Sequence, residues 1–402
     1  MSVWTSPYVL VLGALVLLWS GVSAYVLVTR ALYDFRHLSF NGVRRVVHGW
    51  LARAATPEER TAILRRLPRR TLAGIAADSR IEPEIASAAA RALLERRWDR
   101  LLQRALRHRN EAEKWSRVGA LRTFALAGWA IRWSLLERAL QDEDEDVVAA
   151  AVSLLGSLPD ERATRLLVDA LVEERYSRSR IATQLERRDA VAALLPLVDD
   201  PDDELRYWAA TLLPVAASPA VEVAVASLAG DRSPQVRAAA AKAFAAAGGP
   251  RAAAIGLDLI GDPVFYVRAQ AARAIAAGGR PELAARLVPL MRDPQWWVRT
   301  AAKEALAGLG PAVVPTVIDV LHDDDAFARN GAAEVLVEVG AVRRWAAESV
   351  DEDDDGAVSR LLADALAAGG EPVRRAVAAT VGEEARAKIE RLLAPRPTAR
   401  IA

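Results

Sequence analysis

The chain has 402 residues, of which 52% are hydrophobic and 26% are charged, a composition that excludes an intrinsically disordered protein. It contains no cysteine and only four histidines, which excludes disulfide scaffolds, thiolate metal sites and cysteine nucleophiles and argues against multi-histidine metal sites. The net charge of +1 conceals an asymmetry, because residues 1–138 hold 23 Lys or Arg against 11 Asp or Glu, whereas residues 139–402 hold 30 against 41.

Residues 8–28 form an uncharged run of 21 residues near the start of the chain. As a helix this run would be about 31 Å long, close to the thickness of a bilayer's hydrocarbon core. Trp4, Tyr8 and Tyr25 lie near its ends, where aromatic rings favour the membrane interface. We therefore predict one transmembrane helix over residues 8–28. A cleaved signal peptide is the alternative, but it would have a positively charged start and a shorter apolar run.

The charges around this run predict its orientation. No Lys or Arg precedes it, and arginines follow it closely, so the positive-inside rule places residues 1–7 outside and the rest of the chain in the cytoplasm. The apolar and basic residues of 29–55 alternate at helical spacing, so we predict a basic amphipathic segment that contacts anionic lipid headgroups. The alternative is an atypical first helix of the array that follows. The predicted membrane-surface residues are Arg30, Arg36, Arg44, Arg45 and Arg53.

A repeat of 28 to 31 residues dominates residues 56–394. Four similar segments begin with an aspartate, and an arginine stands six residues after each of these aspartates. The arginines are Arg237, Arg268, Arg299 and Arg329, and we call their position the arginine column. Extended in both directions, the column contains ten positions: 86, 117, 148, 178, 206, 237, 268, 299, 329 and 359. Ten repeats are therefore predicted, followed by a tail over residues 395–402.

Other recurring positions predict the structure of one repeat. Apolar residues lie one residue before the arginine column and three and seven residues after it, which is the spacing of one helical stripe. The aspartate six residues before the column is expected to cap the helix, with a following proline at its first turn. A glycine eleven residues after the column suits a left-handed C-terminal cap. Each repeat is therefore predicted to form two short antiparallel helices. The predicted fold class is an all-α solenoid of about ten such repeats.

The repeated motif D-P-x-x-x-V-R-x-x-A-A-x-A-L, followed by glycine, resembles the HEAT-like repeats first noted in bilin lyases. The resemblance covers about residues 56–394 and is sharpest from 199 to 340. It implies the α-solenoid fold but specifies no activity, since enzymes such as bilin lyases, deoxyhypusine hydroxylases and DNA alkylpurine glycosylases share these repeats with many scaffolds. No histidine here is followed by glutamate, so the paired ligands of the di-iron hydroxylases are absent from the sequence.

Two charged features have structural interpretations. The column arginines could bind phosphate, but pairing with the recurrent aspartates within or between repeats explains them better. The acidic runs, such as residues 142–146 and 351–355, precede helices and lack the spacing of a calcium loop. We predict no catalytic residue, no cofactor and no metal site.

Aromatic residues cluster at the start of the second helix in three successive repeats. Other repeats have polar residues there, for example Glu204 and Gln235, so the fold itself does not require rings at these positions. Exposed aromatic residues are the usual centres of protein interfaces, whereas packing between repeats is the alternative. The predicted partner-binding residues are Phe265, Tyr266, Trp296, Trp297 and Phe327.

Together these features predict a membrane-anchored scaffold that docks a protein partner at the cytoplasmic face of the membrane. The partner could be a membrane-embedded enzyme or transporter, and the lipid bilayer itself is the second expected contact. A bilin-lyase-type enzyme and a membrane-tethered nucleic-acid-binding solenoid are the alternatives. Nucleic acid is disfavoured as a partner because the acidic half would repel phosphate and the basic half adjoins the bilayer.

Overall fold

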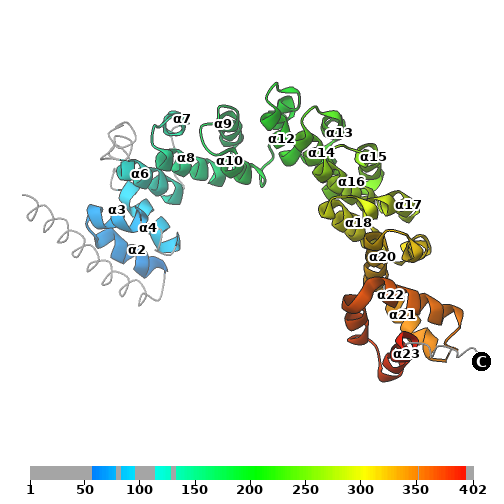
Figure 1. The fold of residues 1–402 in the computed structure, drawn as a ribbon. Coiled ribbons are helices and arrows are strands. Elements are labelled where there is room, and N and C mark those ends of the chain that lie inside the picture. The colour runs from blue at the N-terminus through cyan, green and yellow to red at the C-terminus, as the bar shows by residue number, and fades with distance from the viewer. Residues whose placement is uncertain (1–56, 78–82, 96–113, 128–132, 352, 395–402) are drawn as a thin grey trace, which may run out of the picture. The chain divides into compact units, whose positions relative to one another are not determined.

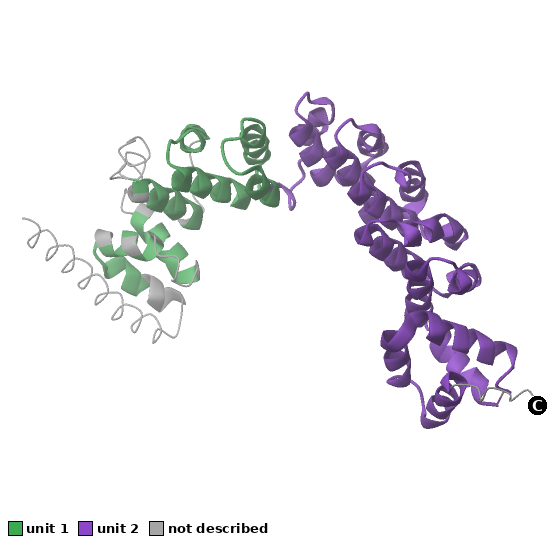
Figure 2. Ribbon diagram, viewed as in Figure 1, with its two compact units in different colours: residues 1–184 green, residues 185–402 purple. Residues whose placement is uncertain are grey.

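The computed structural model describes residues 57–77, 83–95, 114–127, 133–351 and 353–394, and these residues form helices joined by short turns (Figure 1). The chain divides into two compact units, residues 1–184 and residues 185–402 (Figure 2). Both units are stacks of short helices, and each is described separately below. The predicted all-α fold is confirmed for the described residues.

The described helices of the first unit alternate between the two helices of a repeat. Helices α4, α6 and α8 are second helices and pack against one another in chain order. Helices α3, α7 and α9 are first helices. The bounds are α2 Pro57–Arg66, α3 Arg69–Ala77, α4 Pro83–Glu95, α6 Lys114–Ala127, α7 Trp133–Leu140, α8 Glu145–Ser157, α9 Glu161–Val172 and α10 Arg178–Leu185.

In the second unit, α12, α14, α16, α18, α20 and the part of α22 before its kink at Gly370 are second helices, and each packs on the next. The first helices are shorter, and several of them continue into 3₁₀ turns. The bounds are α11 Val191–Leu194, α12 Asp203–Leu212, α13 Pro219–Ser227, α14 Pro234–Ala247, α15 Gly249–Leu259, α16 Phe265–Ala277, α17 Ala284–Leu287, α18 Trp296–Gly308, α19 Val314–Ile318, α20 Ala326–Glu338, α21 Ala341–Glu348, α22 Ala357–Ala378 and α23 Glu383–Leu393.

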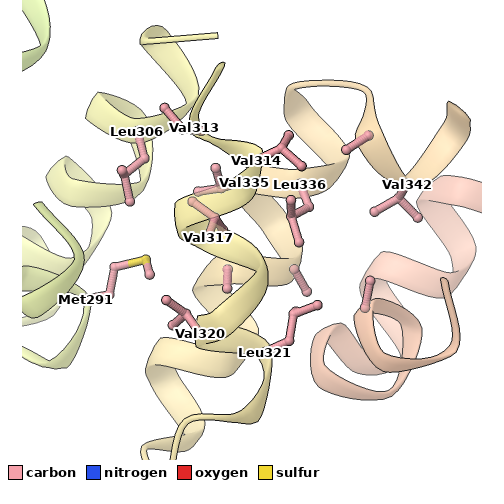
Figure 3. Close-up of a cluster of buried hydrophobic side chains, with 14 of the residues drawn as sticks. Met291, Leu306, Val313, Val314, Val317, Val320, Leu321, Val335, Leu336 and Val342 are labelled. Carbon is pink, nitrogen blue, oxygen red and sulfur yellow. The ribbon is translucent and has the colours of Figure 1, made fainter. Parts of the chain in front are cut away.

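All ten positions of the arginine column lie within a helix, from α4 to α22, as the repeat predicted. The predicted apolar stripe is buried: in α16, for example, Val267, Ala271 and Ile275 are inaccessible to solvent. Alanine in the middle of the stripe lets successive helices approach closely. Figure 3 shows one part of the resulting core, where α19 and α20 meet. In the second unit this core runs continuously from α16 to α23.

The helix starts differ from the prediction by two residues. The recurrent aspartate does not cap the helix; Asp231, for example, accepts a hydrogen bond from the backbone N–H of Ser233, and α14 begins only at Pro234. In α12 the cap is Asp202, two residues after the recurrent aspartate. The aspartate thus shapes the turn before the helix, and Pro201 lies in that turn rather than in the first helical turn.

The predicted glycine has a positive φ in five repeats, at Gly248, Gly279, Gly310, Gly340 and Gly370. Gly340 adopts the predicted left-handed helical conformation, whereas Gly248 and Gly310 combine the positive φ with ψ values of −167° and −166°. Replacing Gly310, whose φ is +76°, with alanine should lower the free energy of unfolding by about 1–2 kcal/mol, because a Cβ atom disfavours this conformation. Gly308→Ala is the matched control: this helical glycine also has open space around it, and its replacement should stabilise by up to about 1 kcal/mol. Urea unfolding measures the stability of both variants. Equal losses of stability in Gly310→Ala and Gly308→Ala would show that the positive φ of Gly310 is not the cause.

The predicted segments 1–7, 8–28, 29–55 and 395–402 lie outside the described residues. Within the described ranges, no single helix has the length and apolar composition needed to cross a membrane. One pair of segments, Trp296–Gly308 and Pro311–His322, meets those criteria jointly but is bent by 109°.

Candidate interaction surface

Arginines of the column link successive repeats in the second unit. Each of three arginines donates two parallel hydrogen bonds to the aspartate 25 residues later, with donor–acceptor distances between 2.6 and 3.1 Å. We call these pairs the arginine–aspartate ladder; they are Arg206–Asp231, Arg237–Asp262 and Arg268–Asp293. Arg117 and Asp142 form a similar pair in the first unit. The predicted structural role of these arginines is confirmed.

Every ladder arginine also stabilises the turn of its own repeat. The Nη1 of Arg237, for example, donates to the backbone carbonyl of Asp231 at 2.8 Å. One guanidinium therefore connects two consecutive turns and leaves few donors for an outside ligand. Because its carboxylate partner is almost fully buried, salt screens the pair less than it would an exposed pair.

The ladder ends at Arg299. The next recurrent aspartate, Asp323, is bound instead by Arg292, which lies in the turn before α18. Arg299 keeps the bonds to its own turn, from Nη1 to the carbonyls of Asp293 and Pro294. Its guanidinium lies 4.2 Å from the centre of the Phe327 ring, in a cation–π contact. The column alone did not predict this exchange of arginines.

The arginine–aspartate ladder and the Arg292–Asp323 pair should make the stability of the fold depend on pH in the acidic range. The guanidinium of Arg292 is the main cause that lowers the pKa of Asp323 from 3.8 to about 2, and Arg206 likewise lowers the pKa of Asp231. A carboxyl group whose pKa is lower in the folded state stabilises the fold above its unfolded pKa, and this contribution is lost as the pH falls through the folded pKa. We expect the urea midpoint to decrease from about pH 4 to about pH 2. Asp323→Asn should show a smaller decrease, and an unchanged pH profile would contradict this role.

The predicted aromatic residues divide into two groups. Trp296, Trp297 and Phe327 have exposed fractions of 51%, 53% and 63%, and we call them the aromatic patch. The two tryptophan rings stack with centroids 4.0 Å apart. Phe265 and Tyr266 are only partly exposed, and Phe265 packs against the core. The patch therefore lies at the start of α18 and α20, whereas in α16 Phe265 packs against the core and Tyr266 lies edge-on to its ring.

A pocket of about 200 Å³ lies between α18 and α20, next to the patch. At one side Lys303 forms an ion pair with Glu334. Lys303 stands four residues after the arginine column, where α12, α14, α16 and α20 have alanine. The Lys303 side chain packs against Gly331 of α20, where an added Cβ atom would lie 3.2 Å from the lysine Cδ. The lining residues are Met291, Trp296, Arg299, Thr300, Lys303, Phe327, Asn330, Gly331 and Glu334.

The repeat pattern did not predict this pocket, although Lys303 in a position otherwise held by alanine was a visible signal. The predicted membrane-surface residues Arg30, Arg36, Arg44, Arg45 and Arg53 lie outside the described residues. Among the residues that the structure describes, no group of three or more His, Asp or Glu side chains could hold a metal ion.

Comparisons with known proteins agree on the fold. The family model described as HEAT repeats matches residues 191–264 and 256–337. No curated protein matches this sequence. The crystal structure of the karyopherin Kap121p bound to the extreme C-terminus of the protein phosphatase Cdc14p is similar, with a TM-score of 0.51 and 13% identity over 84% of this chain and 46% of that chain. A second Kap121p structure gives a TM-score of 0.50 and 13% identity, over 87% and 44%. The chain thus spans less than half the length of these karyopherin chains.

Proposed function

We propose that this HEAT-repeat protein is a scaffold that binds a protein partner through the aromatic patch of Trp296, Trp297 and Phe327. The observation that carries the proposal is the exposure of these rings. Within the described residues, large hydrophobic side chains are exposed at five positions, and three of them form this patch. Aromatic rings contribute most to binding when they are buried at the centre of an interface, so their exposure here favours a partner.

The similarity to the karyopherin gives further support by analogy. That solenoid is described as bound to the extreme C-terminus of another protein. A stack of repeats presents a long, continuous surface to such a segment. The scaffold that we propose needs no cofactor and has no catalytic residue.

The site of action that we propose is the cytoplasmic face of a membrane, with residues 8–28 as the anchor and residues 1–7 outside. The support is the length of the uncharged run and the arginines that follow it. The partner would then be a membrane-embedded enzyme or transporter. A reporter enzyme that works only in the cytoplasm should be active when it is fused after Ala402. Activity of a reporter that works only on the opposite side of the membrane would overturn this orientation.

Affinity capture from a detergent extract tests the proposed function. The tagged full chain should recover a protein in stoichiometric amount, and the double variant Trp296→Ala/Trp297→Ala should not. Val223→Ala is the matched control, because Val223 is 66% exposed but lies on α13, a first helix. Recovery of the same protein by the double variant would overturn the role of the patch, and co-purified pigment or nucleic acid would favour an enzyme or a nucleic-acid-binding protein.

A further inference from the structure

The chain contains its own examples of how a column arginine binds a carboxylate. In the ladder, Nε and Nη2 of the arginine donate to the two oxygens of one aspartate. This planar, two-point geometry is specific to guanidinium and carboxylate groups. A column arginine with both donors available would therefore be a preformed site for a carboxylate.

Arg299 is such an arginine. Its Nη1 is bound to the carbonyls of its own turn, as in the ladder, so the side chain is held in place. Its Nε and Nη2 donate to none of the described residues, because Arg292 binds Asp323. The Phe327 ring covers one face of the guanidinium, which leaves the donors at its edge accessible.

The pocket between α18 and α20 brings further groups to the same place. Arg299, Trp296 and Phe327 all line it. The Oδ1 atom of Asn330 is buried there and accepts no hydrogen bond from the described residues. A buried amide oxygen of this kind favours a ligand that brings an N–H donor, such as a peptide backbone.

We propose that this pocket binds an acidic side chain, Asp or Glu, from a peptide segment of the protein partner. Arg299 would bind the carboxylate through Nε and Nη2, as the ladder arginines bind aspartate, and Asn330 would accept a backbone N–H of the same segment. An apolar residue of the segment would contact the aromatic patch. Among the residues that line the pocket, Lys303 neutralises Glu334 and the charge of Arg299 remains. The local charge therefore favours this occupant despite the net negative charge of residues 139–402. The inference rests on the proposed scaffold function and specifies the chemistry of its partner.

Selection from a random peptide library displayed on phage tests the inference without knowledge of the natural partner. The full chain in detergent is the bait, alongside Arg299→Gln and Trp297→Ala. We expect the wild-type protein to enrich peptides with Asp or Glu beside an apolar residue. Arg299→Gln should keep the apolar preference and lose the acidic one. Trp297→Ala should lose the apolar preference.

A selected peptide then permits a quantitative test. Changing its acidic residue to the amide should weaken binding to the wild-type protein about tenfold or more, since a charge-assisted pair is lost, and should have little effect with Arg299→Gln. Arg273→Gln is the matched control, because this partly exposed arginine is paired with Glu304 and does not line the pocket.

The outcomes separate the inference from the proposed function. Apolar enrichment without an acidic preference would overturn the carboxylate site and retain the scaffold surface. Peptides that bind Trp297→Ala as well as the wild type would overturn the role of the patch, and with it the inference. An equal loss of the acidic preference in Arg273→Gln would show that the preference does not depend on Arg299, which also overturns the inference. Failure to enrich any peptide would overturn both.

Discussion

Replacing Asp262 with alanine should destabilise the second unit by about 3 kcal/mol, a larger loss than we expect for Gly310→Ala. The side chain of Asp262 is 6% exposed and binds Arg237, which is 15% exposed, through two hydrogen bonds. Its removal leaves a largely buried guanidinium without its carboxylate. It also removes the acceptor for the backbone N–H of Val264, which shapes the turn before α16.

Urea unfolding followed by circular dichroism measures this loss. Because each repeat contacts only its neighbours, the variant should unfold in a broader transition as well as at a lower midpoint. Asp324→Ala is the control, since this aspartate lies exposed in a turn, and its replacement should change stability by less than about 0.5 kcal/mol. Equal midpoints for Asp262→Ala and Asp324→Ala would show that the ladder does not stabilise the stack.

Replacing Trp297 with alanine should weaken partner binding about thirtyfold, which corresponds to about 2 kcal/mol, while the protein stays folded. The ring is 53% exposed and stacks on Trp296, so its removal leaves no cavity in the core. Phe265→Ala should behave in the opposite way. Because Phe265 packs against the core while remaining partly exposed, we expect a loss of about 2 kcal/mol in stability and little effect on binding.

Both variants should be measured for thermal midpoint and partner affinity on the same preparations. A fall in the midpoint for Trp297→Ala, with binding reduced only in proportion to folded protein, would show that the tryptophan acts in packing. Normal stability and lost binding for Phe265→Ala would extend the binding surface onto α16. Either result would change which of the five predicted aromatic residues form the interface.

The sequence alone determined the features that depend on positions close together in the chain. The apolar stripe of Val267, Ala271 and Ile275 lies within one helix, and the positive φ of a glycine such as Gly310 is a requirement of a single turn. These local rules recur in each repeat, so the periodicity is sufficient to predict the helix pairs and their stacking. The cap was misplaced because an aspartate can bond the backbone N–H two residues later outside a helix as well as at its start.

Only the tertiary structure decided which side chains of equivalent positions are exposed. Phe265 and Trp296 both stand three residues before the arginine column, yet one packs against the core and the other is 51% exposed. Trp296 instead lines the pocket between α18 and α20, where Lys303 stands in place of the alanine of other repeats. Only the tertiary structure likewise shows that Arg292, and not Arg299, binds Asp323. Pairing between repeats depends on distances across about 30 residues, which the repeat pattern of a single chain does not specify.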